Sequence, residues 1–140
     1  MDRLTKEQRS RNMSRIKSRD TSIEKAVRQY LTQRGYRYRI HFDAPGHPDI
    51  AFPRFKIAIF INGCFWHNHG CALSSIPKSN VSYWQEKLAR NSRRDEDNMK
   101  KLILLGWNVE IIWECQLKIS PEQELKRTSE RLGVLMMKSA

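Results

Sequence analysis

Apolar residues between positions 21 and 35 recur at the spacing of a helix that buries one face. That spacing is i, i+3, i+4, i+7 and i+8, and here it is filled by Ile23, Ala26, Val27, Tyr30 and Leu31. Thr21 with Glu24 three residues later matches a capping box, which satisfies N–H groups of the first turn, and Gly35 is a typical helix terminator. The pattern therefore predicts a helix that begins after Thr21 and ends at Gly35.

After Gly35 the pattern changes to that of strands. Residues 36–41 alternate apolar and basic side chains, as a half-buried strand does. Two more strands are expected at 49–52 and at 57–61, joined by a short turn, and the second is apolar enough to be buried on both faces. Residues 107–113 predict a further strand.

Helical spacing returns in the second half of the chain. Residues 82–105 predict two helices or one broken helix, ended by Gly106. Ser120, Pro121 and Gln123 open a final helix with a cap, a proline in the first turn and a capping-box glutamine. Because helices and strands intermix around one polar loop at 62–75, we expect a two-layer or three-layer α/β domain built on one mixed sheet.

Residues 1–20 differ from the rest of the chain. They are polar and basic, and Met13 and Ile16 are the two apolar anchors. An apolar face this thin does not pack firmly on a core. The sequence therefore divides into a basic arm at 1–20 and a single domain at 21–140.

The charge balance adds a class of partner. The chain has 140 residues with 26 Lys and Arg against 15 Asp and Glu, a net charge of +11. Such an excess indicates a polyanion, most commonly nucleic acid, although a well-solvated basic surface would also produce it. No apolar run approaches the roughly 20 residues of a membrane span, and the first residues do not resemble a secretory signal, so we expect a cytoplasmic protein.

The cysteines predict a metal site. The chain has three, an odd number that argues against a disulfide framework, and two histidines, His67 and His69, lie between Cys64 and Cys71. With Cys115 they make a Cys3His set, which binds zinc tetrahedrally and would staple the polar loop to the sheet. The alternative is three buried structural thiols. Spacing alone does not choose between His67 and His69.

Asp49 is a candidate for a catalytic Mg2+ ligand. It lies where a turn enters a strand, and a cation there would neutralise charge on a phosphodiester; the alternative is a simple turn cap. Restriction-type nucleases add a Glu-x-Lys on the next strand, where this chain has apolar residues at 59–61. A histidine can act as the base instead, and His67 is available if His69 binds zinc. Asp95 or Asp97 would then orient it.

Two aromatic pairs interrupt polar surroundings, Phe65 with Trp66 and Tyr83 with Trp84. Exposed aromatics beside basic residues suit base stacking or insertion into a duplex, and core packing is the alternative.

Taken together, these motifs resemble the very-short-patch-repair (Vsr) mismatch endonucleases from about Arg9 to Cys115. The most specific matches are 20–25, Pro48 with Asp49, 63–67, 83–87, 91–95 and 106–115. The resemblance implies a restriction-endonuclease-like fold that nicks one DNA strand 5′ of the thymine in a T:G mismatch, the product of 5-methylcytosine deamination. It also implies double-stranded DNA with a T:G mismatch as the partner and a bacterial-type cytoplasmic, nucleoid-associated location. Because nicking one strand needs only one active site, we expect a monomer.

The resemblance also assigns roles. Asp49 would bind Mg2+ with the backbone at Ile61, His67 would activate water, Asp95 would be its partner, and Glu24 would be a nearby acid. Structural zinc would be bound by the set Cys64, His69, Cys71 and Cys115.

DNA contacts follow from the same resemblance. Phe65, Trp66 and Trp84 would wedge beside the mismatch from the major groove, and the arm with Met13 and Ile16 would enter the minor groove. Asn62 stands where the best-known family pattern has histidine; its amide can hydrogen-bond a phosphate or a metal-bound water but cannot act as a base. Two alternatives remain at this point, a zinc-stabilised DNA-binding module without cleavage activity and a nuclease of the same fold that cuts another DNA structure.

Overall fold

The computed structural model describes residues 21–64 and 79–138. Its helices and strands are, in chain order, α2 (Ser22–Gln33), β1 (Arg39–Ile40), β2 (Ile50–Phe52), β3 (Ile57–Asn62), α3 (Val81–Leu104), β4 (Asn108–Trp113), α4 (Glu114–Ile119) and α5 (Pro121–Lys138). The predicted arm at 1–20 and most of the predicted polar loop lie outside the described residues.

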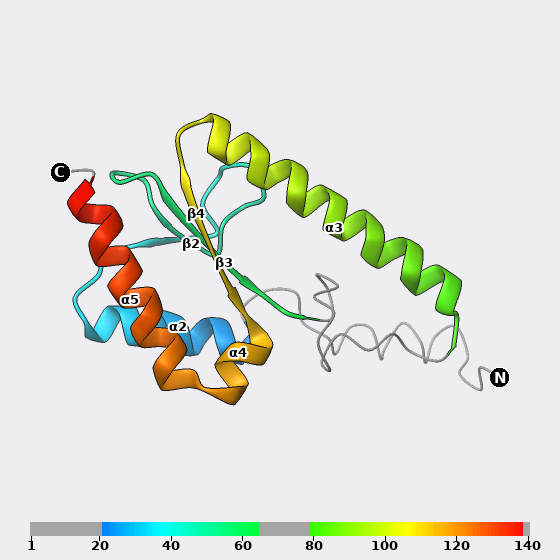
Figure 1. Cartoon of the computed structure of the whole chain (residues 1–140), viewed down its shortest axis with the longest axis horizontal. Helices are drawn as coiled ribbons and strands as arrows, with labels where there is room; N and C mark the ends of the chain where they lie inside the picture. Colours follow the sequence, from blue (N-terminus) through cyan, green and yellow to red (C-terminus); the bar gives the residue numbers. More distant parts are fainter. Residues whose placement is uncertain (1–20, 65–78, 139–140) are drawn as a thin grey trace.

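The strands form one mixed sheet in the order β1-β2-β3-β4. β1 and β2 pair antiparallel, β2 and β3 pair antiparallel, and β3 pairs parallel with β4 from Ile57 opposite Asn108 to Asn62 opposite Trp113. Figure 1 shows α3 on one face of this sheet and α2, α4 and α5 on the other. The prediction of an α/β domain around one mixed sheet is confirmed, and the arrangement is the three-layer one.

The capping signals place α2 as predicted. Thr21 is the N-cap, and its Oγ1 accepts a hydrogen bond from the Glu24 backbone N–H at 3.3 Å. At the other end Gly35 has φ +83°, a conformation that glycine adopts without steric cost. Val27 and Leu31 on the predicted apolar face are fully buried.

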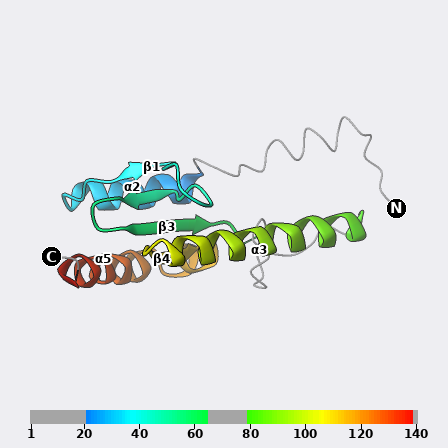
Figure 2. The ribbon, with the colours of Figure 1, turned by 90° about the horizontal axis from the view of Figure 1, so that it is seen from above.

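The main core lies between the sheet and the layer of α2, α4 and α5. The inward-facing sheet residues alternate along each strand, as pleating requires; they are Ile50, Phe52, Ile57, Ile59, Ile61 and Ile112. They pack with side chains from all three helices. Figure 2 shows α2 near β1, whereas α5 lies along the β4 side, so the two helices divide this face between them.

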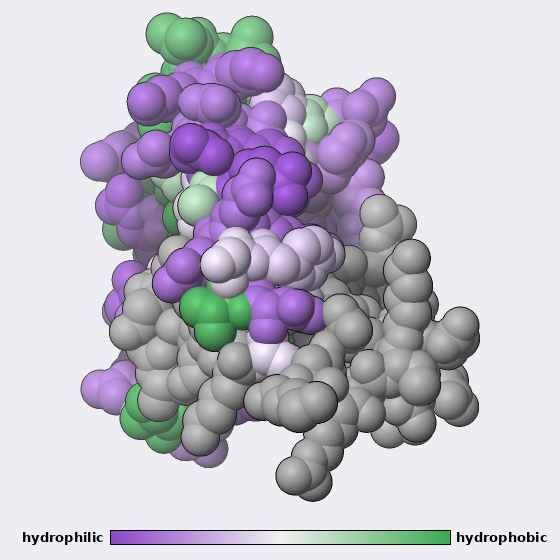
Figure 3. Space-filling view, turned by 90° about the vertical axis from the view of Figure 1, so that its right-hand side faces the viewer, coloured by the Kyte–Doolittle hydropathy of each residue, from purple (hydrophilic) through white to green (hydrophobic). Residues whose placement is uncertain are grey.

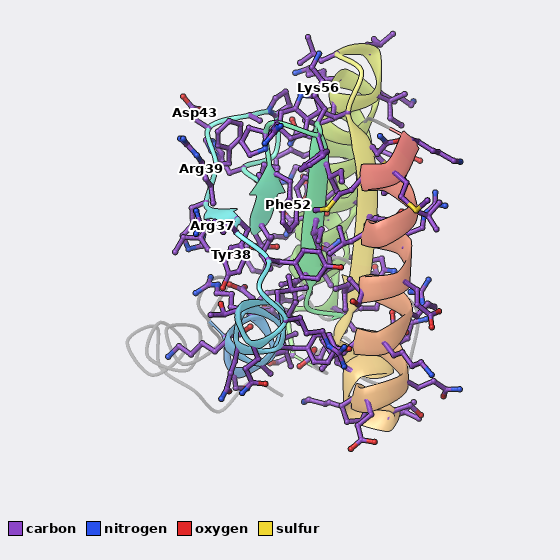
Figure 4. The ribbon with its side chains drawn as sticks, turned by 90° about the vertical axis from the view of Figure 1, so that its left-hand side faces the viewer. Arg37, Tyr38, Arg39, Asp43, Phe52 and Lys56 are labelled. Atoms are coloured by element: carbon purple, nitrogen blue, oxygen red, sulfur yellow. The ribbon has the colours of Figure 1, made fainter. Side chains whose placement is uncertain are left out.

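Two predicted boundaries need correction. The segment 82–105 forms one continuous helix, α3, rather than two helices or a broken one, because it contains neither proline nor glycine to interrupt the backbone hydrogen bonds. The strand expected at 36–41 is reduced to Arg39–Ile40. Tyr36 and Tyr38 instead place their rings edge-on against Phe52, with centroids 6.1 and 6.4 Å away (Figure 4, where Tyr38 and Phe52 are labelled).

The short helix α4 is an addition to the predicted elements. It follows β4 directly and buries Leu117 in the core. Six residues are too few to display a helical period in the sequence, which is why the pattern did not reveal it. None of the described helices combines the length and apolarity needed to cross a membrane.

Candidate active site

Asp49 is held in place by the neighbouring strand. It directly precedes β2, and its Oδ2 accepts a hydrogen bond from the backbone N–H of Ile61 on β3 at 2.7 Å. This distance is short for an N–H donor, as is usual when the acceptor is an ionised carboxylate. The contact joins residues 12 positions apart and fixes the carboxylate at the C-terminal end of β3.

A cleft of about 1400 Å3 opens beside this carboxylate. Its floor comes from β3 and β4, one wall comes from the loop 41–49, and another comes from α3. The described lining residues that bear on the chemistry are His41, Asp43, His47, Asp49, Ile61, Asn62, Arg93, Arg94, Asp95 and Glu96. Figure 1 shows the loop, in cyan, beside the C-terminal half of α3.

The cleft brings together residues that are distant in the sequence. Asp49 comes from the start of β2, Asn62 from the end of β3, and Asp95 from the middle of α3. Asp97, the other carboxylate considered as a partner for a catalytic histidine, is exposed and does not line the cleft. Of the two helix carboxylates, Asp95 is therefore the one at the candidate site. His67 lies outside the described residues.

Glu24 occupies a different environment. Its side chain is 2% exposed in the first turn of α2, and its Oε2 accepts from Arg28 Nη2 at 3.1 Å in an i, i+4 ion pair. Glu24 is not among the described residues that line the cleft. Within the described structure its carboxylate is therefore paired inside its own helix.

Cys64 and Cys115 lie side by side although 51 positions separate them. The backbone N–H of Cys115 donates to Cys64 Sγ at 3.4 Å, and the N–H of Cys64 donates to Glu114 Oε1 at 3.3 Å. Cys64 is fully buried. His69 and Cys71 lie outside the described residues, and within residues 21–64 and 79–138 no group of three or more Cys, His, Asp or Glu is arranged to hold a metal.

Trp84 is largely buried at the start of α3, with 8% of its surface exposed. The adjacent Tyr83 is 51% exposed, and its ring meets the Trp84 ring edge-on at 5.2 Å. Lys87 Nζ lies 5.8 Å from both ring centroids, within cation–π range. The other residues predicted to insert side chains into the duplex lie outside the described residues; they are Met13, Ile16, Phe65 and Trp66.

The exposed face of α3 carries a row of polar and aromatic side chains that the sequence motifs did not indicate as a group. Tyr83, Lys87, Arg90, Asn91 and Arg94 line a shallow groove along the helix. Their spacing of four, three, one and three residues places them on one helix face, and this spacing is the signal that would have found them. Figure 3, viewed from the end at which α3 begins, shows mainly hydrophilic side chains over the described surface.

Two histidines of the cleft were also missed. His41 and His47 lie on the loop 41–49 and both have left-handed backbone conformations, with φ of 49° and 47°. The turn-rich composition of this segment predicted a turn but not which way its side chains face. No sequence signal indicated that both would line the same cleft as Asp49.

The carboxylates in the cleft suit a hard divalent cation. Asp49 offers carboxylate oxygen, the type of ligand that Mg2+ prefers, and the backbone of Ile61 adjoins Asp49 through its hydrogen bond. A mixed sheet flanked by helices, with an aspartate at a strand end beside a cleft, is consistent with the restriction-endonuclease-like class of α/β proteins.

The comparisons with known proteins identify the family within this class. The family model for the DNA mismatch endonuclease Vsr matches residues 1–73. A type II nicking enzyme, V.XorIIP of Xanthomonas oryzae, is 44% identical over 117 residues, which cover 83% of this chain and 86% of that enzyme. The DNA mismatch endonuclease Vsr of Escherichia coli K12 is 40% identical over 126 residues, 89% of this chain and 80% of that enzyme. This chain belongs to the Vsr family of DNA endonucleases, as the resemblance predicted.

Proposed function

We propose that this endonuclease nicks one strand of duplex DNA on the 5′ side of the thymine in a T:G mismatch. The observation that carries the proposal is the Asp49 carboxylate, fixed by the Ile61 N–H at 2.7 Å in a cleft shared with Asp95. The names of the relatives agree with it: one is a mismatch endonuclease and others are nicking enzymes. Nicking one strand requires one active site, so we propose a monomer.

Asp49 and the backbone carbonyl of Ile61 would hold Mg2+. When bound, this cation would neutralise the negative charge that develops on the phosphate during hydrolysis. The role of the protein is to orient Asp49. The Ile61 N–H does this, because its hydrogen bond to Oδ2 fixes the direction of the carboxylate in the cleft.

His67 is proposed as the base that takes a proton from the attacking water. An imidazole with an ordinary pKa of ~6.5 accepts a proton at neutral pH, whereas Asn62, which lines the cleft, has an amide that does not. Asp95 would accept a hydrogen bond from the second ring nitrogen and so set the tautomer. Glu24 remains proposed as a nearby acid, and its ion pair with Arg28, one turn further along α2, orients its carboxylate.

The basic arm and the aromatic residues are proposed to recognise the distorted duplex. Met13 and Ile16 would enter the minor groove, while Phe65 and Trp66 would stack beside the mismatch. Trp84 is largely buried, so in place of the direct stacking expected of it, it would support the exposed Tyr83 and the partly exposed Lys87 beside it. The net charge of +11 would supply salt-sensitive attraction to phosphates.

A structural zinc is proposed at Cys64, His69, Cys71 and Cys115. The support is the contact between Cys115 N–H and Cys64 Sγ, because thiolate ligands of structural zinc commonly accept backbone N–H bonds and must come within one small sphere. Bound zinc would join the end of β3 to the start of α4. Because the relatives from Xanthomonas oryzae and Escherichia coli are bacterial proteins, we propose a bacterial-type cytoplasmic location at the nucleoid.

A cleavage panel tests the proposed function. T:G duplexes with varied flanking sequences, the matched T:A duplex and other mismatches are incubated with the protein and Mg2+, and the products are mapped to the nucleotide. The proposal expects one nick, 5′ of the mismatched thymine, that EDTA abolishes. Retardation of the T:G duplex without a metal-dependent nick would instead favour the DNA-binding module, and cutting of other structures would favour a nuclease of different specificity.

A further inference from the structure

Two cationic or hydrogen-bond-donating side chains of the cleft have no role in the chemistry described above. His47 comes from the loop wall and Arg93 from the α3 wall, and both are exposed. Within the described part of the chain, neither side chain makes a hydrogen bond or an ion pair. The neighbouring Arg94, by contrast, donates to Asn91 Oδ1 at 3.3 Å.

The two walls that carry these residues meet at Gly46. A Cβ placed on Gly46 would lie 3.1 Å from Asn98 Cβ on α3 and 3.2 Å from the Phe60 ring on β3, so the loop is packed closely against both. His47 is the next residue after this contact. Arg93 precedes Asn98 by five residues, about 7.5 Å along the helix axis at 1.5 Å per residue. Both side chains line the same cleft, His47 from the loop wall and Arg93 from the wall formed by α3.

The charge of the cleft explains why such donors are needed. The described carboxylates that line it are Asp43, Asp49, Asp95 and Glu96. Together they repel the phosphates of a DNA strand that enters. Arg93 offers a guanidinium, which fits a phosphate in a bidentate manner, and His47 offers a ring N–H, which donates to a phosphate oxygen whether or not the imidazole is charged.

We propose that His47 and Arg93 form a phosphate clamp, in which the two side chains bind the same backbone phosphate of the strand to be cut from two walls of the cleft. This inference rests on the proposed function, since it takes duplex DNA as the occupant of the cleft. It assigns substrate binding to residues outside the metal and base positions. The clamp would hold the strand next to Asp49 against the repulsion of the carboxylates.

Binding measurements without cleavage test the clamp. Affinity for a T:G duplex is measured in EDTA at several salt concentrations for the wild type, His47→Ala, Arg93→Ala, Arg93→Lys and the double variant His47→Ala/Arg93→Ala. Lys126→Ala is the matched control, because it removes one exposed positive charge from α5 on the opposite side of the sheet. Thermal unfolding confirms that each variant is folded, as expected for exposed positions.

Each alanine variant is expected to bind about tenfold more weakly, the usual effect of losing a hydrogen bond to a charged group. Arg93→Ala should also reduce the slope of log affinity against log salt by about one, Arg93→Lys should restore that slope, and Lys126→Ala should change neither quantity. Because both residues hold one phosphate, the double variant should lose less than the product of the single losses.

Three results would overturn the clamp: single variants that bind like Lys126→Ala, an unchanged salt slope for Arg93→Ala, or strictly multiplicative losses in the double variant. Its failure is distinguishable from failure of the proposed function. If the wild type leaves the T:G duplex uncut in Mg2+ but both variants lose affinity, the nicking assignment is wrong and the clamp stands. If the wild type nicks the T:G duplex and the variants bind it with normal affinity, the nicking assignment stands and the clamp is wrong.

Discussion

The backbone N–H of Ile61 donates to Oδ2 of Asp49, so the carboxylate before β2 is oriented by the strand beside it. Oδ2 is engaged with the protein, and this contact orients the carboxylate as a whole. The sheet thus positions an acid at the cleft through a backbone donor on the neighbouring strand.

Asp49→Asn removes the charge of the carboxylate but keeps a hydrogen-bond acceptor in the same position. The asparagine side-chain carbonyl can still accept from the Ile61 N–H, so the midpoint of thermal unfolding should change by only a few degrees. Nicking should fall by at least about a hundredfold, because several kcal/mol of metal-assisted charge stabilisation is lost. Single-turnover cleavage of a T:G duplex measures this, and a nicking rate near that of the wild type would remove Asp49 from the chemistry.

His67→Ala should lose most of the nicking activity and keep DNA affinity. General-base catalysis typically contributes ~10²–10⁴-fold, so the rate should fall within that range. The affinity for the T:G duplex in EDTA should stay within about threefold of the wild type, since the role proposed for His67 is proton transfer and not phosphate binding. His69→Ala is the comparison. Because His69 is the proposed zinc ligand, this substitution should lower the stability of the protein. If His69→Ala is instead stable but inactive, His69 is the base and His67 is the zinc ligand.

Gly46→Ala should disturb the wall of the cleft. The added methyl would lie 3.1 Å from Asn98 Cβ, and the alanine backbone would also have to adopt φ +79°. We expect a loss of about 1–3 kcal/mol in unfolding free energy, from strain and overpacking together, and weaker DNA binding because His47 moves with the loop.

Gly35→Ala provides the control for Gly46→Ala. Gly35 has a similar φ of +83°, but a Cβ there meets nothing within 4 Å. It should cost about 1 kcal/mol of conformational strain and leave DNA affinity unchanged. Equal effects of the two substitutions on DNA affinity would show that the Gly46 contact does not shape the cleft. Denaturant unfolding and binding titrations in EDTA measure both.

The zinc assignment predicts about one zinc per chain by elemental analysis. Cys71→Ala or Cys115→Ala should greatly lower the fraction of folded protein, because structural zinc contributes folding free energy directly. A strong chelator should lower the unfolding midpoint of the wild type. Protein that contains no zinc and shows the same midpoint before and after chelation would contradict the assignment.

Local patterns predicted most of the secondary structure. The capping box at Thr21 and Glu24 and the apolar spacing that follows it identify α2, and the apolar run at 57–61 identifies β3, because both signals are contained within a few residues. The continuity of α3 was harder to predict. Its polar middle lacks a clear apolar stripe, and the side chains there line the cleft instead of packing into the core.

The site was only partly predictable for a different reason. Motif resemblance identified Asp49 and Asp95, but their meeting in one cleft depends on where α3 crosses the sheet, which no local pattern encodes. The same is true of Cys64 and Cys115, which are joined by the turn from β4 into the unpredicted helix α4. His47 was missed because its orientation depends on the close contact of Gly46 with α3.

The most direct test of the account is a nucleotide-resolution map of cleavage on a T:G duplex in Mg2+, with the wild type and Asp49→Asn side by side. The account predicts one nick, 5′ of the mismatched thymine, made by the wild type and lost in Asp49→Asn, although both proteins bind the duplex. An uncut T:G duplex with the wild type, or the same nick made at the same rate by Asp49→Asn, would contradict it.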